Sequence, residues 1–252
     1  MAEPEIKSTY PKRIQTKRTR ATAHLKVFYA RFRALIGSIL FLGLASAAGS
    51  ILFFAWIAEE VLEGDTRIFD ETVRGFIHGL ANDGLTFLMK FITLLGSTLF
   101  LSLLCACVLV IFIAKKWKSA ALLLMTTMAG AVILNFILKV SFERTRPIPF
   151  FETPLPESYS FPSGHSLYAV CFYVGLAWLI TSRLSNFLTQ FVIWIFAVFL
   201  CLLIGLSRIY LGVHYPSDVV AGFAAAIVWL SAVISIDYMI KKRLESLKSI
   251  EF

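Results

Sequence analysis

The chain has 252 residues, of which 58% are hydrophobic and 16% are charged, whereas about 25% of the residues in an ordinary soluble domain are charged. This composition excludes a soluble globular protein and a disordered one. Lys and Arg number 24 against 16 Asp and Glu. On a soluble protein that excess would suggest a nucleic-acid partner, but the positions of the cations along the chain indicate otherwise.

Residues 1–33 form a basic arm in which Glu3 and Glu5 are the only acids. Cytoplasmic segments of membrane proteins carry the excess of Lys and Arg, so we predict that this arm lies in the cytosol. We interpret it as a solvated arm that touches anionic lipid, because it offers few aromatic side chains on which bases could stack. The sequence therefore predicts a membrane partner and no nucleic acid.

Six uncharged apolar runs are each long enough, or nearly so, to cross a bilayer, which takes about 20 residues. They cover residues 34–57, 91–114, 119–138, 166–182, 184–207 and 219–236. The sequence predicts an all-α integral membrane bundle of six transmembrane helices over residues 34–239, followed by a short basic cytosolic tail, 240–252. With both termini inside, most Lys and Arg lie on the cytosolic side, as the charge rule requires.

Between the first two runs, Phe69, Val73, Phe76, Ile77 and Leu80 recur at helical spacing. Charged residues occupy the other faces, so the pattern predicts an outer amphipathic helix. We expect this helix to lie at the membrane interface and cover the bundle; guiding a lipid toward a site is the alternative role.

The first polar motif ends the third run, where Lys139, Arg146 and Pro147 form a K-x6-R-P pattern. Taken alone the motif is weak. A Lys at the end of a membrane helix commonly extends its ammonium group to the interface, and an Arg there commonly anchors the helix.

The second polar motif, Phe-Pro-Ser-Gly-His-Ser, immediately precedes the fourth run. Ser163 could cap a helix and Gly164 could turn the chain. Alternatively, Gly164 lets backbone N–H groups approach an anion and Ser163 adds a hydroxyl donor, which would leave His165 beside the bound group.

The third motif, S-R-x5-H-x3-D, places Arg208, His214 and Asp218 between the fifth and sixth runs. Separately, Asp218 could be a first-turn acid and His214 a loop residue. Under the predicted topology, however, all three motifs lie on the same outer side of the membrane. Purely structural roles for all three would require three independent coincidences.

Together the motifs suit a phosphoryl group. Lys139, Arg146 and Arg208 can neutralise its oxygens. No cluster of carboxylates is present in the sequence to hold Mg²⁺ or Zn²⁺, so we predict a reaction independent of metal and of any other cofactor.

A neutral imidazole held through its other nitrogen by Asp218 has the tautomer needed for attack on phosphorus, so His214 is the predicted nucleophile. His165 is the predicted acid and base, which protonates the departing alkoxide and later takes a proton from water. The two roles could be exchanged, but the four-residue spacing from His214 to Asp218 favours this assignment.

The three motifs closely resemble those of the type 2 phosphatidic acid phosphatase superfamily, which also includes vanadium haloperoxidases. The resemblance covers about residues 70–237. It implies a phosphohistidine at His214, oriented by Asp218, with His165 as acid and base. It also implies a six-helix membrane topology with the site open to the non-cytoplasmic leaflet. The phosphate-binding residues it implies are Lys139, Arg146, Ser163, Gly164 and Arg208.

Arg144 and Thr145 stand where many relatives carry an Arg-Pro pair. We interpret Arg144 as a surface cation paired with Glu143, the alternative being an auxiliary phosphate ligand. The difference bears on the subfamily and leaves the chemistry unchanged.

We therefore expect an integral membrane lipid phosphatase in a bacterial plasma membrane. Its candidate substrates are phosphatidic acid, phosphatidylglycerol phosphate and undecaprenyl diphosphate. The alternatives are a vanadate-dependent peroxidase, against which the membrane setting argues, and a non-catalytic protein that binds lipid phosphate, against which both histidines and Asp218 argue.

Overall fold

A computed structural model of the chain describes residues 45–151 and 157–248. Within these residues every regular element is helical and no strand occurs, which confirms the all-α class for this part of the chain. The predicted basic arm, 1–33, lies outside the described residues. The start of the first apolar run, the segment 152–156 and residues 249–252 also lie outside them.

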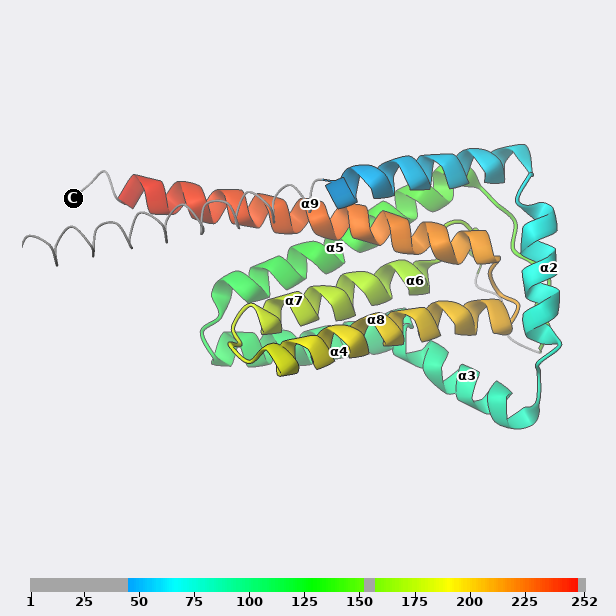
Figure 1. Cartoon of the computed structure of the whole chain (residues 1–252), viewed down its shortest axis with the longest axis horizontal. Helices are drawn as coiled ribbons and strands as arrows, with labels where there is room; N and C mark the ends of the chain where they lie inside the picture. Colours follow the sequence, from blue (N-terminus) through cyan, green and yellow to red (C-terminus); the bar gives the residue numbers. More distant parts are fainter. Residues whose placement is uncertain (1–44, 152–156, 249–252) are drawn as a thin grey trace, which may run out of the picture. The chain divides into compact units, whose positions relative to one another are not determined.

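The elements follow one another in chain order (Figure 1), with short connections except between α5 and α6, where residues 143–163 intervene. The first described helix covers Ala45–Glu63. It is followed by α2 (Arg67–His78), α3 (Asp83–Leu95), α4 (Thr98–Ala114), α5 (Lys118–Phe142), α6 (Gly164–Ala169), the π-helical η1 (Val170–Val174), α7 (Gly175–Thr181), α8 (Phe187–Tyr210) and α9 (Pro216–Lys248).

Five of the described helical stretches are long and apolar enough to cross a membrane: Ala45–Glu63, Lys118–Phe142, Gly164–Thr181, Phe187–Tyr210 and Pro216–Arg243. Large apolar side chains such as Phe191 and Phe196 are exposed along α8. A surface of this kind needs an apolar solvent, so the chain is an integral membrane protein.

The second predicted span, 91–114, is divided between α3 and α4, which are bent by 49° relative to each other. Two local interactions produce the break. Gly96 ends α3, and the Ser97 hydroxyl accepts a hydrogen bond from Phe100 N at 3.3 Å and so begins a new helix. The pair is either one broken span or a re-entrant segment.

The helix that carries the second motif is the most enclosed of the candidate spans. Residues buried inside the protein make up 61% of the window in Gly164–Thr181, against 22% in α8. α6 packs against α5, α8 and α9. Small residues make the closest approach possible: a Cβ added at Gly222 of α9 would lie 2.7 Å from Ser163 O.

α2 is the amphipathic helix predicted over 69–80, and its polar side faces the protein. Asp70 and Arg74 are 0% and 4% exposed, whereas Phe69 and Phe76 are 54% and 71% exposed. Figure 1 shows α2 running crosswise at the ends of α8 and α9, which it contacts. A soluble surface helix buries its apolar side; the opposite arrangement in α2 fits a helix whose outer side meets lipid.

Candidate active site

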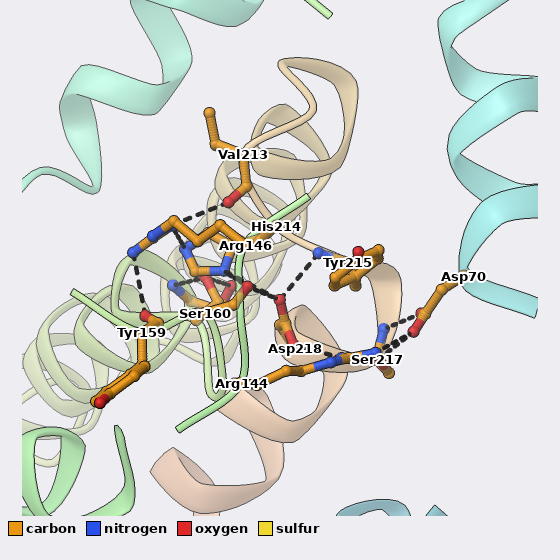
Figure 2. Close-up of polar contacts among 12 residues, drawn as sticks. Asp70, Arg144, Arg146, Tyr159, Ser160, Val213, His214, Tyr215, Ser217 and Asp218 are labelled. Atoms are coloured by element: carbon orange, nitrogen blue, oxygen red, sulfur yellow. Dashed lines mark hydrogen bonds and ion pairs between the residues drawn. The ribbon is translucent and has the colours of Figure 1, made fainter. Parts of the chain in front are cut away.

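The third motif forms the centre of the site. His214 lies in the turn between α8 and α9, and Asp218 lies in the first turn of α9; both are buried. Nδ1 of His214 is 3.3 Å from Oδ2 of Asp218, and the same oxygen accepts a hydrogen bond from Tyr215 N at 2.9 Å. The four-residue spacing therefore brings the carboxylate to the imidazole, as the sequence predicted (Figure 2).

The other ring nitrogen of His214 meets a cation. Nε2 lies 3.0 Å from Nη1 of Arg146. A guanidinium can only donate, so Nε2 accepts with its lone pair and the ring proton sits on Nδ1, facing Asp218. This is the tautomer that a nucleophilic imidazole requires.

The pKa of His214 is lowered from 6.5 to about 3. Burial is the main cause, and the charges of Arg146 and Arg208 add to it, while the hydrogen bond and the charge of Asp218 oppose it. The imidazole is therefore neutral near pH 7, and Nε2 carries a lone pair that accepts from Arg146 instead of a proton.

Arg146 is held by backbone carbonyls on both sides of the site. Its Nε donates to Ser158 O at 2.8 Å, and Nη1 donates to Val213 O at 2.9 Å. Burial lowers the pKa of Arg146, and Asp218 opposes that shift. These bonds fix the guanidinium beside His214 before any substrate arrives.

Lys139 and Arg208 come to the site from the ends of two long helices. Lys139, in the last turn of α5, donates to Tyr159 O. Arg208 lies in the last turn of α8 rather than in the connection where the sequence had placed it, and its Nη1 donates to Thr93 Oγ1 at 2.7 Å. The buried Nε of Arg208 has no hydrogen-bond partner within the described residues.

The second motif is joined to the third through the backbone. Ser163 N donates to Asp218 O at 2.9 Å, and the Ser163 hydroxyl accepts from Ser166 N at 3.4 Å, so Ser163 is the N-cap of α6. Gly164 follows beside Asn135, whose Nδ2 would lie 3.3 Å from an added Cβ. The capping function that the sequence left open is present. The separate backbone bond from Ser163 N holds this residue next to Asp218.

His165 is half-buried and points toward the bend between α3 and α4. A Cβ added at Gly96 would lie 3.4 Å from His165 Cδ2. His165 is within electrostatic range of Arg208, His214, Arg146 and Lys139. The structure therefore gathers all eight predicted site residues, drawn from α5, the segment after it, α6, α8, the turn after α8 and the start of α9.

The interpretation of Arg144 as a surface cation paired with Glu143 is wrong. The guanidinium is mostly buried and forks between two carboxylates: Nη1 is 2.6 Å from Asp218 Oδ1, and Nη2 is 2.8 Å from Asp70 Oδ2. Burial alone would lower the pKa of Arg144, but the two carboxylates outweigh it and the pKa is raised. Asp70 lies far from Arg144 in the sequence, and the packing of α2 against α9 brings the two together.

Within the part of the chain that the structure describes, no three His, Cys, Asp or Glu side chains gather where they could hold a metal ion. The cations that act on His214 electrostatically include Arg146 and Arg208, and Lys139 lies within electrostatic range of both. Independence from metal stays a prediction, to be tested by chelation.

Comparison with known proteins bears on this site directly. The PAP2 superfamily pattern matches residues 120–242, a range that contains all three motifs. Phosphatidylglycerophosphatase B of Bacillus subtilis (strain 168) is 33% identical over 175 residues, which cover 69% of this chain and 77% of the relative.

The chain belongs to the PAP2 superfamily. Another relative, the undecaprenyl-diphosphatase of Sulfolobus acidocaldarius, is 32% identical over 146 residues, or 55% of this chain and 66% of the relative. The crystal structure of a transmembrane PAP2 type phosphatidylglycerolphosphate phosphatase from Bacillus subtilis superposes with a TM-score of 0.71 at 31% identity. That match covers 77% of this chain and 97% of the solved one.

Sequence reasoning missed three polar residues of this PAP2 site. Ser160 donates to Asp218 Oδ2 and lies 3.4 Å from His214 Nδ1. Asp70 accepts hydrogen bonds from Ser217, and both are buried. No local pattern marks Ser160, whereas Asp70 stood out only as a charge on an amphipathic helix.

Proposed function

We propose that this PAP2 membrane protein is a lipid phosphatase that hydrolyses a phosphomonoester or diphosphate through a phosphohistidine at His214. One observation carries the proposal: the Nε2 lone pair of a neutral His214 lies 3.0 Å from the guanidinium of Arg146. A phosphate oxygen that binds Arg146 brings its phosphorus to the nucleophile.

The phosphate is bound by side chains and backbone N–H groups from all three motifs. Lys139, Arg146 and Arg208 neutralise its oxygens, with the unpaired Nε of Arg208 as a free donor. Ser163 contributes its hydroxyl, and Gly164 allows the backbone N–H groups at the start of α6 to come close. In the transition state the same donors stabilise the charge that develops on the equatorial oxygens.

The reaction takes two steps. His214 Nε2 attacks phosphorus, the bond from phosphorus to the lipid oxygen breaks, and His165 delivers a proton to that oxygen. His165 then takes a proton from water, whose oxygen attacks the phosphohistidine; the P–N bond breaks and inorganic phosphate leaves. Asp218 stabilises the charge that His214 carries in the intermediate.

A lipid substrate follows from the setting of the site. The helices that carry it cross a membrane, and α2 beside it turns Phe69 and Phe76 outward, which suits a helix at headgroup depth. The names of two relatives refer to phosphatidylglycerophosphate and undecaprenyl diphosphate. We take lipids of these two kinds and phosphatidic acid as the candidate substrates.

The proposed topology has six spans, with α3 and α4 together as one bent crossing. The membrane domain covers residues 34–239, between a basic arm (1–33) and a basic tail (240–252), both in the cytosol of a bacterial cell. The site then opens to the non-cytoplasmic side of the plasma membrane. Cysteine accessibility labelling at Ser185, in the connection from α7 to α8, and at Ala81, between α2 and α3, tests this: only the second should react from outside.

The function is tested by phosphate release from the three candidate lipids in detergent with EDTA present. Wild type should release phosphate, His214→Ala should lose at least about 1,000-fold in rate, and ³²P-labelled substrate should leave an acid-labile phosphohistidine on wild type alone. His24→Ala, in the basic arm, controls for the loss of a histidine. A folded wild type that releases no phosphate from any of the lipids contradicts the proposal and favours a non-catalytic lipid-phosphate binder.

A further inference from the structure

A buried carboxylate on α2 reaches the catalytic turn. Asp70 is 0% exposed and projects from α2 toward the start of α9 (Figure 2). Its Oδ1 accepts from Ser217 N at 3.0 Å, and its Oδ2 accepts from Ser217 Oγ at 2.7 Å and from Arg144 Nη2 at 2.8 Å. A buried charge with three donors on its two oxygens is well compensated, and this holds it in one orientation.

Arg144 continues the network to Asp218. Its Nη1 donates to Asp218 Oδ1 at 2.6 Å and to Ser217 Oγ at 2.7 Å. The other oxygen of Asp218 is then turned to His214 and Tyr215 N. Arg144 therefore helps to set the rotation of the Asp218 carboxylate, whose other oxygen also accepts from Ser160. Asp70, Ser217 and Thr66 hold Arg144 in position.

We propose that Asp70 is a positioning residue of the active site, which holds Asp218 in register with His214 through Arg144 and Ser217. This inference rests on the proposed phosphatase function, because Asp70 contacts neither His214 nor the phosphate-binding residues. On this proposal α2 contributes a positioning residue to the active site and also presents its apolar side to lipid.

The chemistry of the network requires an aspartate at this position. An asparagine has one acceptor oxygen and an NH₂ group that only donates. In Asp70→Asn the NH₂ group would face either Ser217 N or the pair formed by Ser217 Oγ and Arg144 Nη2, so at least one buried donor loses its partner. Arg144 then keeps its bonds to Asp218 and to Thr66 Oγ1 but loses the charge of its second carboxylate partner, so Asp218 is held less firmly.

The neighbouring acid on α2 offers a matched control. Glu71 pairs with Arg74 at 2.9 Å and its side chain is 54% exposed. Among the described residues, no hydrogen bond or ion pair joins it to Arg144 or Asp218. Glu71→Gln makes the same change from carboxylate to amide one residue along the same helix, outside the network.

The test compares kcat and KM for phosphate release by wild type, Asp70→Asn and Glu71→Gln. Mutation of a residue that orients a directly acting site residue commonly lowers activity about 10- to 100-fold. We expect Asp70→Asn to lower kcat by that factor with KM within about threefold, since the phosphate-binding side chains are untouched, and Glu71→Gln to stay within about twofold of wild type. Equal kcat values for the two variants would overturn the inference.

A double-mutant cycle separates positioning from simple support of the fold. Arg144→Lys keeps a charge but cannot fork between two carboxylates. If Asp70 acts through Arg144, Asp70→Asn adds no more than about a twofold loss in the Arg144→Lys background. If the fold reductions in kcat of the two single variants multiply in the double variant, Asp70 acts independently of Arg144 and the inference is overturned.

Should Asp70→Asn fail to fold in detergent, Ser217→Ala tests the same network. It removes one hydroxyl that bridges Asp70 and Arg144 and leaves both charges paired. We expect kcat to fall about 3- to 10-fold, the effect of one lost hydrogen bond, and wild-type kcat would overturn the inference. A wild type that releases no phosphate removes the proposed function itself, whereas an active wild type with unaffected variants removes only the role of Asp70.

Discussion

The contact between α6 and α9 lends itself to a quantitative prediction. Gly222 of α9 faces the first turn of α6, and an added Cβ would lie 2.7 Å from Ser163 O and 3.0 Å from Ser166 Cβ. Carbon atoms pack best at about 3.5–4.0 Å, so Gly222→Ala requires a displacement of about 0.5–1 Å. Both neighbours belong to or adjoin backbone, and no flexible side chain can absorb the change.

The displaced segment carries the start of the second motif. Overpacking of a buried contact costs about 1–3 kcal/mol of stability. A misplacement of about 1 Å in a catalytic group can cost about 100-fold in rate, so we expect Gly222→Ala to lower kcat about 10- to 100-fold, equivalent to about 1.4–2.7 kcal/mol of activation free energy. KM should change as well, because Ser163 and Gly164 contribute to the proposed phosphate site.

The assay combines initial rates of phosphate release in mixed micelles with the thermal unfolding midpoint of each variant. Gly75→Ala, in α2, is the matched control, because nothing lies within 4 Å of its added Cβ. Replacing a mid-helix glycine by alanine there should stabilise the helix by about 0.5–1 kcal/mol and leave kcat unchanged. A Gly222→Ala variant with wild-type kcat and an unchanged midpoint would refute the reasoning, since it would show that α6 and α9 separate without cost.

Three further predictions concern single side chains. Ser160→Ala removes a hydroxyl that donates to Asp218, so we expect kcat to fall about 2- to 10-fold in the phosphate-release assay; an unchanged kcat would exclude a role for this hydroxyl. Arg208→Lys keeps the charge but loses the planar guanidinium, and kcat/KM for the lipid should fall at least about tenfold; wild-type kinetics would show that a point charge suffices. Burial lowers the pKa of His214 from 6.5 to about 3, so the unfolded chain binds more protons than the folded protein between these values. The contribution of His214 to the free energy of unfolding is therefore constant above pH 6.5. It falls by at most about 1.4 kcal/mol per pH unit as the pH drops from 6.5 toward 3. The unfolding midpoint of His214→Gln should depend less on pH between 7 and 4 than that of wild type, and equal slopes would contradict a buried neutral imidazole.

The local properties of the sequence determined the membrane character and predicted the histidines and cations that the structure brings together. Apolar runs of bilayer length leave few alternatives, because backbone groups in lipid must be satisfied within a helix. His214 and Asp218 are four residues apart, across the turn that begins α9, so the chain keeps the carboxylate close to the imidazole wherever the distant helices lie. The helices nevertheless extend beyond the apolar runs: α5 reaches Phe142 and α8 reaches Tyr210, because polar ends at the interface continue the helix.

The partners of the charges depended on the tertiary structure. Arg144 sits beside Glu143 in the sequence, yet it binds Asp70 and Asp218, each 74 residues away. Periodicity reports which residues share a face of one helix, but it carries no information on which distant helix packs against that face. The burial of the polar side of α2 and the bond from Ser160 to Asp218 follow from that packing, since a buried charge adopts whatever partner the assembled helices bring within reach.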